Sequence, residues 1–193
     1  MLPLFPDDTG SPPFETEDLR SNLTRFLAEA FDDPDTGTEA PIGTFKWGVY
    51  AFFDYDGEPI YVGQTKEMVS TRIRRHLTNQ RTDAVAMSVL DPFEVYEVEV
   101  WPLPQFQQTP ASDAKARAHL DALERLIFEE AVANSTFGAV LNEKDPPVAT
   151  VTVARPASLR FRLVSDTVYR IRAHPDFRIA RRAQVISRLA QVI

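Results

Sequence analysis

The spacing of apolar residues changes several times along the chain, and each change predicts a different element. Residues 47–53 alternate with the two-residue period of a β-strand, and a second β-like run follows at residues 59–63. The turn between them, at residues 54–57, ends in Asp-Gly, which favours a hairpin. If this four-residue turn is symmetric, Tyr50 and Tyr61 lie directly opposite each other on one face of the hairpin.

A helix is predicted after the hairpin by three apolar residues that recur every four positions, Val69, Ile73 and Leu77. On the same geometry, Arg72 and His76 lie one turn apart on one flank of this apolar stripe, whereas Arg74 and Arg75 point further towards solvent. A phenol, a guanidinium and an imidazole near one another suit chemistry at a phosphate. Arginine binds phosphate through a bidentate fork, and tyrosine or histidine can transfer a proton.

A third strand and a long helix are predicted further along. Residues 93–101 are rich in β-branched and aromatic residues, and residues 112–134 give the longest helical pattern. In that helix Glu124 falls inside the arc of the apolar residues, whereas Glu129 points to the opposite side. A carboxylate directed inward costs several kcal/mol unless it is paired or bound to a metal. Glu124 is therefore predicted either to hold a metal ion or to pair with a buried arginine.

The N-terminal segment shows three kinds of pattern in succession. Residues 1–16 hold four prolines and several small polar residues, which predicts an irregular arm. Residues 17–31 carry an apolar stripe of helical period, and residues 32–43 are a turn-rich linker. We interpret the helix as an element for packing or dimerisation.

The C-terminal segment predicts strands followed by a helix. Residues 150–154 and 159–164 have β-branched or alternating character, and residues 166–173 are compatible with strand or helix. Residues 175–193 predict a final helix with one apolar face. Its predicted apolar residues are Ile179, Ile186, Leu189, Ala190 and Ile193, with Arg181 and Arg188 on the opposite side.

Length and composition narrow the class of protein. A chain of 193 residues with 44% hydrophobic residues forms one domain with embellishments, or one domain with a small appendage. The absence of cysteine excludes disulfides, thiol nucleophiles and cysteine-based zinc sites, and it fits a reducing cytosol. No apolar run approaches the roughly 20 residues of a membrane span, and the first residues do not resemble a signal peptide. We therefore expect a cytoplasmic protein without a membrane partner.

The net charge of −7 hides a segregation along the chain. Residues 1–150 are acidic, whereas residues 151–193 carry nine arginines and only two acidic residues. Either this basic end contacts something anionic, or it packs on the acidic surface of the protein itself.

The two hairpin strands also carry a family resemblance. The tripeptides Gly48-Val49-Tyr50 and Tyr61-Val62-Gly63, followed by Gln64-Thr65-Lys66, resemble the paired motifs of the GIY-YIG nuclease superfamily. The helix with Arg72 and His76 matches the same family. The resemblance extends over about residues 45–142.

This resemblance implies an α+β fold with a small, mainly antiparallel, three-stranded central sheet flanked by helices. An N-terminal arm and helix would occupy residues 1–44, the nuclease-like domain residues 45–147, and a basic extension residues 148–193. By the same resemblance, Glu124 holds a divalent metal, Mg²⁺ or Mn²⁺, and Asn142 supports the site. The implied catalytic residues are Tyr50, Tyr61, Arg72, His76, Glu124 and Asn142. The residues expected to contact nucleic acid are Lys66, Arg72, Arg74, Arg75, Arg178, Arg181 and Arg182.

The resemblance implies a metal-dependent endonuclease that hydrolyses DNA phosphodiester bonds. A short chain without a long DNA-binding extension resembles restriction or other defence nucleases, for which double-stranded DNA is the expected partner. Cutting both strands implies either a homodimer or sequential nicking. Two alternatives stay open on the sequence. One is a module that binds nucleic acid or protein and has lost cleavage, and the other is a nuclease acting on RNA or single-stranded DNA.

Overall fold

A computed structural model describes residues 14–78, 90–142 and 144–192 of the chain. The arm predicted for residues 1–16 lies almost wholly outside the described residues, as does the connection predicted for residues 81–87. In the described part, no helix is long and apolar enough to cross a lipid bilayer.

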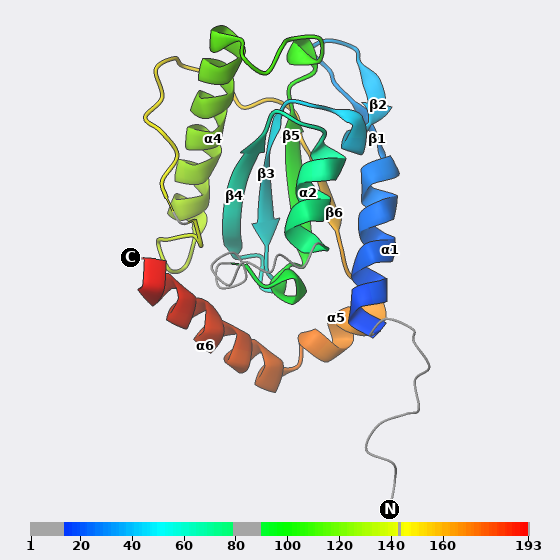
Figure 1. The fold of residues 1–193 in the computed structure, drawn as a ribbon. Helices are drawn as coiled ribbons and strands as arrows, with labels where there is room; N and C mark the ends of the chain where they lie inside the picture. Colours follow the sequence, from blue (N-terminus) through cyan, green and yellow to red (C-terminus); the bar gives the residue numbers. More distant parts are fainter. Residues whose placement is uncertain (1–13, 79–89, 143, 193) are drawn as a thin grey trace, which may run out of the picture.

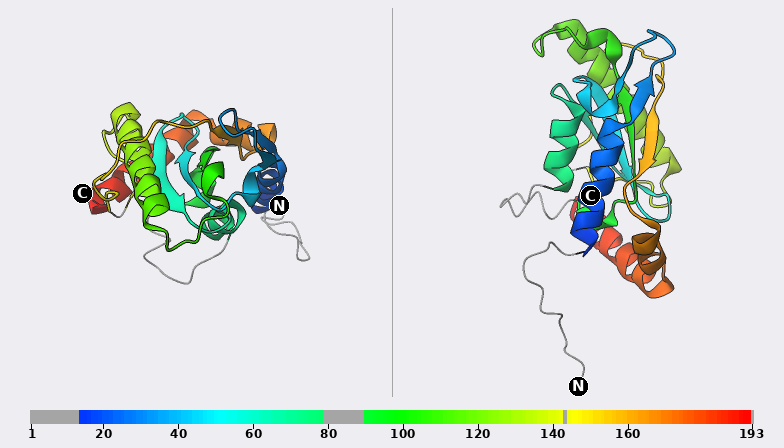
Figure 2. Two further views of the ribbon diagram at one scale, coloured as in Figure 1. Left: turned by 90° about the horizontal axis from the view of Figure 1, so that it is seen from above. Right: turned by 90° about the vertical axis from the view of Figure 1, so that its right-hand side faces the viewer.

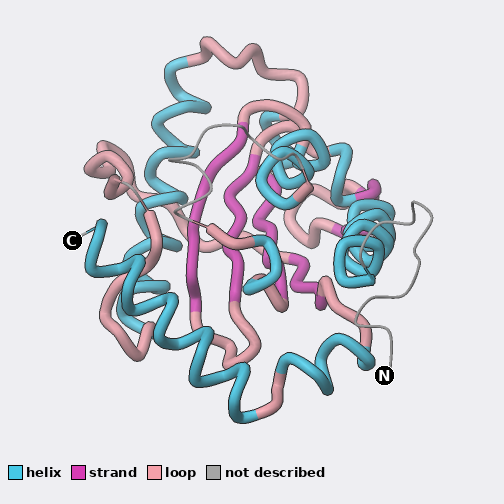
Figure 3. The backbone as a smooth tube through the Cα atoms, turned by 60° about the horizontal axis from the view of Figure 1, so that its bottom comes forward, coloured by secondary structure: helices cyan, strands magenta, loops and turns pink. Residues whose placement is uncertain are grey.

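The fold is α+β, as predicted, and its centre is an antiparallel sheet (Figures 1 and 3). The strand order is β4-β3-β5-β6. The strands are β3 (Gly48–Phe53), β4 (Pro59–Thr65), β5 (Glu97–Pro102) and β6 (Leu159–Arg162). The sheet thus has one strand more than predicted, because β6 comes from the basic extension and pairs with β5.

The register of the β3–β4 hairpin differs from the predicted one. Tyr50 lies opposite Gly63, and Tyr61 lies opposite Phe52. The symmetric four-residue turn assumed from the sequence is wrong. Five residues, 54–58, separate the paired Phe53 and Pro59, and a register shift after Phe52 leaves one further residue of β4 without a partner. The two tyrosines still share a face as diagonal neighbours, with ring centroids 6.2 Å apart.

Helices cover both faces of the sheet (Figure 2). Helices α1 (Phe14–Ala28) and α2 (Val69–Leu77) pack on the face that carries Tyr50, and α4 (Ala114–Asn134) packs on the other face. All three apolar residues predicted to anchor α2 are buried. Helix α4 begins after Asp113, whose side chain accepts a hydrogen bond from the Ala116 N–H at 2.8 Å.

Shorter elements complete the fold. A two-stranded sheet joins β1 (Ala30–Asp32) to β2 (Glu39–Pro41). Three 3₁₀ turns lie at Ile42–Thr44, Pro92–Glu94 and Pro104–Phe106. The second of them shows that the third predicted strand began too early, since Asp91 caps the turn by accepting a hydrogen bond from Phe93 N–H at 3.0 Å. Residues 150–154 form no strand.

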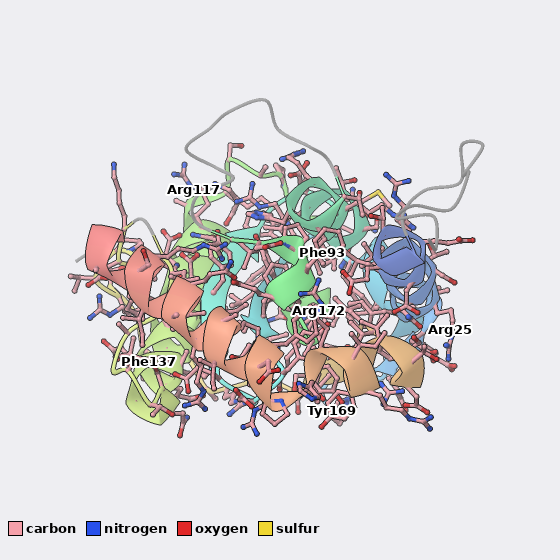
Figure 4. All side chains as sticks on the ribbon, turned by 90° about the horizontal axis from the view of Figure 1, so that it is seen from below. Arg25, Phe93, Arg117, Phe137, Tyr169 and Arg172 are labelled. Carbon is pink, nitrogen blue, oxygen red and sulfur yellow. The ribbon has the colours of Figure 1, made fainter. Side chains whose placement is uncertain are left out.

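Two helices, α5 (Asp166–Arg172) and α6 (Pro175–Val192), lie across one end of the sheet (Figure 4). The buried residues of α6 include Arg181, Val185 and Leu189, whereas Ile179 and Ile186 are 69% and 53% exposed. The helix is therefore turned relative to the prediction: Leu189 of the predicted apolar face is buried, but so is Arg181, which was predicted on the opposite side.

Arginines of α6 contact the β3–β4 turn in this orientation. Arg178 and Arg182 form ion pairs with Asp56 in the β3–β4 turn, at 2.6 and 3.2 Å, and the Arg181 guanidinium lies 4.6 Å from the centre of the Tyr55 ring. Although burial alone would raise it, hydrogen bonds from the two arginines lower the pKa of Asp56 below its usual value. Charged contacts, together with the burial of Val185 and Leu189 in the core, thus accompany this orientation of the helix.

Other arginines of the extension also pair with acidic residues of the chain. The pairs are Arg155 with Glu99 and Glu130, Arg160 with Glu97, Arg172 with Glu15, and Arg188 with Glu94. These pairs agree with one of the two interpretations of the charge segregation, in which the basic C-terminal segment packs on the acidic surface of the protein itself.

Candidate active site

The centre of the site is Tyr50, which is completely buried in β3. Its hydroxyl accepts a hydrogen bond from Nε of Arg72 at 3.1 Å and lies 3.0 Å from Nε2 of His76. Arg72 and His76 are four residues apart on α2, so one face of one helix presents both groups to the phenol. The predicted phenol, guanidinium and imidazole therefore meet at one place.

The neighbouring strand allows this meeting because it carries glycine opposite Tyr50. A Cβ added to Gly63 would lie 2.7 Å from the Tyr50 hydroxyl oxygen and 2.9 Å from the Tyr61 ring. Both rings therefore rest directly on the backbone of β4. Tyr61 stacks on Phe52 with ring centroids 6.0 Å apart, and its ring centre is 5.4 Å from that of His76.

The environment of Tyr50 favours its neutral form. Burial raises the pKa of Tyr50 far above its usual value, and the neighbouring Tyr61 adds to this, whereas the Arg72 charge opposes it. The phenol thus keeps its proton in the structure shown. Loss of that proton requires an acceptor close by, and His76 is within hydrogen-bonding distance.

Glu124 approaches the same edge of the sheet from α4. Its Oε2 accepts a hydrogen bond from Nε2 of Gln64 at 2.9 Å, and the same nitrogen donates to Oδ1 of Asp121 at 2.8 Å. Burial raises the pKa of Glu124 to about 7, with the Gln64 hydrogen bond opposing this rise. Asp121 raises that pKa further, whereas the positive charges of Arg72 and Lys66 lower it. Arg72 therefore acts electrostatically on both Tyr50 and Glu124.

Asn142 holds the outer strand of the sheet at the level of the tyrosine motif. Its side chain accepts a hydrogen bond from the Val62 N–H at 3.1 Å and donates one to the Val62 carbonyl at 2.8 Å. Because β4 is an edge strand, these backbone groups have no strand on that side, and the amide takes its place. Asn142 thus fixes the segment between Tyr61 and Gly63.

The residues expected to contact nucleic acid fall into two places. Lys66 and Arg72 lie beside the site, since both charges act on Glu124. Arg75 makes a bidentate pair with Glu67 at 2.7 and 2.8 Å, and Arg74 donates to the Thr24 hydroxyl at 3.4 Å.

The three arginines of α6 that were expected to contact nucleic acid gather at Asp56, in the turn at the opposite end of β4. Arg181 is 4% exposed, and its Nη1 donates to the Arg172 carbonyl at 2.9 Å. The structure therefore does not bring Arg178, Arg181 and Arg182 to the tyrosine site, and their contact with nucleic acid stays a prediction.

Sequence reasoning missed two polar residues and one glycine of the site. Asp121 precedes Glu124 by three residues, a spacing that places both on one side of a helix. Gln64 follows Val62 by two residues in β4, which places it on the face covered by α4. Gly63 belongs to one of the family tripeptides, but its close approach to Tyr50 could not be predicted, because it depends on the register of the hairpin.

A scan against protein-family models matches residues 46–129 to the GIY-YIG catalytic domain. This segment belongs to the GIY-YIG family. The match contains Tyr50, Tyr61, Arg72, His76 and Glu124, and it ends before Asn142. Comparisons with curated proteins and with solved structures gave no significant match.

GIY-YIG proteins are generally nucleases that depend on a divalent metal, and oxygen donors suited to such an ion lie near Glu124. Among the described residues, no three or more His, Cys, Asp or Glu side chains gather as a metal-binding group. The carboxylates of Glu124 and Asp121 nevertheless share one partner, and Oε1 of Gln64 is buried without a hydrogen-bond partner. These are the oxygen donors that Mg²⁺ and Mn²⁺ prefer, and the site fits an ion that keeps part of its shell for water and phosphate.

Proposed function

We propose that the chain is a metal-dependent endonuclease that hydrolyses DNA phosphodiester bonds. The observation that supports this most is the position of Arg72, which bonds the Tyr50 hydroxyl and acts on the Glu124 carboxylate. A group suited to moving a proton thus contacts this guanidinium, and the carboxylate suited to holding a metal is close enough to be affected by its charge. A guanidinium fork is a preferred ligand of a phosphate group.

In this proposal Tyr50 and His76 together take up the proton of the attacking water. The attacking water passes its proton to the Tyr50 oxygen while the phenol gives its own proton to Nε2 of a neutral His76. The new bond forms between the water oxygen and phosphorus, and the bond to the 3′ oxygen breaks. This relay avoids a free phenolate, which the buried position of Tyr50 disfavours.

Glu124 and Arg72 together hold the metal ion and the phosphate group. Arg72 orients the scissile phosphate and compensates its negative charge, while Asn142 keeps β4 and its Tyr61 in place. A divalent ion held by Glu124 would stabilise the negative charge that develops on the leaving oxygen.

Cutting both strands of a duplex takes either two such centres or sequential nicking by one centre, and we include a homodimer in the proposal. Helix α1 is an unsuitable contact, because its apolar residues Leu19, Leu23 and Phe26 are buried in the core. The exposed Ile179 and Ile186 on α6 are the surface we assign to the dimer. Ile179→Asp with Ile186→Asp should halve the mass measured by light scattering, whereas the Gln184→Asp control should not. A restriction or defence role fits a double-strand cutter of this size.

A cleavage assay tests the proposed activity. Purified protein is incubated with plasmid, single-stranded DNA or RNA, in Mg²⁺ or in EDTA, beside Glu124→Gln and its control Glu129→Gln on the exposed side of α4. We expect metal-dependent cutting of the plasmid that is lost in Glu124→Gln and kept in the control. Binding without cutting by any form would indicate a binding module. Cutting of RNA or single strands alone would refute the duplex substrate, and discrete plasmid fragments, rather than a smear, would support restriction.

A further inference from the structure

The side chain of Gln64 lies between two carboxylates in the position that suits a cation. Its Nε2 donates to Asp121 at 2.8 Å and to Glu124 at 2.9 Å. A neutral amide gives one hydrogen bond to each carboxylate but cannot neutralise their charges. Two carboxylates that share one partner, one of them 9% exposed, favour a positively charged ligand at this point.

The other end of the same amide is unsatisfied. Oε1 of Gln64 is buried and has no hydrogen-bond partner among the described residues. A buried acceptor without a partner costs about 1–3 kcal/mol. Rotation of the amide about its last torsion exchanges nitrogen and oxygen, and the terminal torsion of glutamine is broad enough for this. The oxygen is then directed at the point between the carboxylates, which is favourable only when a cation occupies it.

From these contacts we propose that Asp121 and Gln64 join Glu124 as ligands of one divalent cation, giving a site with two carboxylates and one amide oxygen. The inference rests on the proposed nuclease function and extends its metal site beyond Glu124. The spacing of Asp121 and Glu124 on α4 puts their Cβ atoms about 5–6 Å apart, so both side chains can reach one ion from a rigid helix. Gln64 reaches the same point from β4, which Asn142 holds in place.

A purely structural role for Asp121 makes a different prediction. In that case the carboxylate only ties α4 to β4 through the Gln64 amide. Asp121→Asn keeps an oxygen that can accept the Gln64 hydrogen bond and removes only the charge. A structural role therefore predicts unchanged metal affinity, whereas a ligand role predicts weaker binding.

The test is Mn²⁺ binding by the full chain without nucleic acid, measured by electron paramagnetic resonance and by calorimetry. Asp121→Asn and Gln64→Met should each weaken Mn²⁺ binding by about tenfold or more, and Glu124→Gln should weaken it at least as much. Glu129→Gln, which removes one charge from the exposed side of the same helix, should bind as the wild type does. Asp121→Glu, which restores the charge on a longer stem, should recover part of the affinity, and thermal unfolding checks that each variant is folded.

Three outcomes would overturn the inference. Asp121→Asn that binds Mn²⁺ within about twofold of the wild type would leave Glu124 as the sole carboxylate ligand. Gln64→Met with equal or tighter binding would make the amide a competitor of the cation. A wild type that binds no Mn²⁺ would remove the site altogether.

Plasmid cleavage, run on the same samples, separates this inference from the proposed function. If the wild type cuts DNA and Asp121→Asn keeps full Mn²⁺ affinity, the nuclease stands and the three-ligand site is refuted. If Mn²⁺ binding depends on Asp121 and Gln64 but nothing is cut, the metal site is supported and the nuclease proposal fails.

Discussion

Two glycines of the tyrosine motifs are required by close approach rather than by unusual backbone angles. A Cβ on Gly63 would meet the hydroxyl and ring of Tyr50, whereas a Cβ on Gly48 would lie 2.8 Å from the Trp101 carbonyl oxygen of β5. The first clash is with side chains of the site, and the second is with the backbone of the sheet. The same substitution at the two positions should therefore have different effects.

Gly63→Ala should impair cleavage more than folding. Displacing the Tyr50 hydroxyl by about 1 Å from Arg72 and His76 is expected to slow cleavage roughly 100-fold. Gly48→Ala, in contrast, should lower the melting temperature, because the strand backbones must separate. Cleavage rates and thermal unfolding of both variants check this, and a fully active Gly63→Ala would contradict the assigned role of Tyr50.

Glu124 should make the metal-free protein less stable as the pH rises. The folded-state pKa is raised to about 7, above the usual 4.5, so the contribution to stability is fully present below pH 4.5 and is lost as the pH rises through 7. Glu124→Gln should therefore raise the free energy of unfolding at pH 8 by up to about 3 kcal/mol and leave it unchanged near pH 4.

Denaturant unfolding in EDTA at both pH values measures this difference. Glu94 also has a pKa raised to about 7 by burial, so only the comparison of variant with wild type isolates Glu124. Glu129→Gln is the matched control and should show no pH-dependent gain. Equal stability of Glu124→Gln and wild type at pH 8 would contradict this prediction, because it would show that neighbouring groups offset the cost of burying the ionised carboxylate.

At the scale of elements, β4 depends on a side chain from outside the family match. Asn142→Ala leaves the N–H and carbonyl of Val62 without their partner, which should cost about 1–3 kcal/mol of stability. Hydrogen exchange at the Val62 amide should accelerate in this variant. Asn134→Ala, which removes an exposed hydrogen bond to the Glu130 carbonyl on α4, is the control and should leave that exchange rate unchanged.

The sequence predicted helices correctly where the burial of one apolar face determines their orientation. The apolar stripe of α2 placed Arg72 and His76 correctly, and the arc of α4 placed Glu124 inside, because both helices bury a regular apolar face. It predicted the hairpin register wrongly, since a bulge has no signature in the alternation of residues. It also missed the bridge between Asp121 and Gln64, which joins segments distant in the sequence.

Helix α6 shows a different limit of sequence reasoning. Its predicted apolar residues Ile179 and Ile186 are exposed, while the side that docks also carries arginines, two of which pair with Asp56 in a distant turn. Periodicity along one helix contains no information about a carboxylate that approaches from another element.

At the scale of the whole molecule, the positions of the basic residues predict which of them bind nucleic acid. Lys66 is exposed and lies beside the site, whereas Arg178 and Arg182 are already paired with Asp56. Lys66→Gln should reduce the salt dependence of DNA binding by about one unit of slope. The double variant Arg178→Gln with Arg182→Gln should leave the slope unchanged and lower the melting temperature. A slope that falls by about two in the double variant would instead place α6 on the DNA.

The pairing of β6 with β5 has a consequence for synthesis of the protein. The family match ends at residue 129, yet β5 has β6 along one edge, and Arg160 of β6 pairs with Glu97 of β5. A chain emerging from a ribosome presents its N-terminal part first. The sheet that carries Tyr50 therefore stays incomplete until most of the polypeptide has been translated, and a product terminated before residue 159 would leave one edge of β5 without its partner strand.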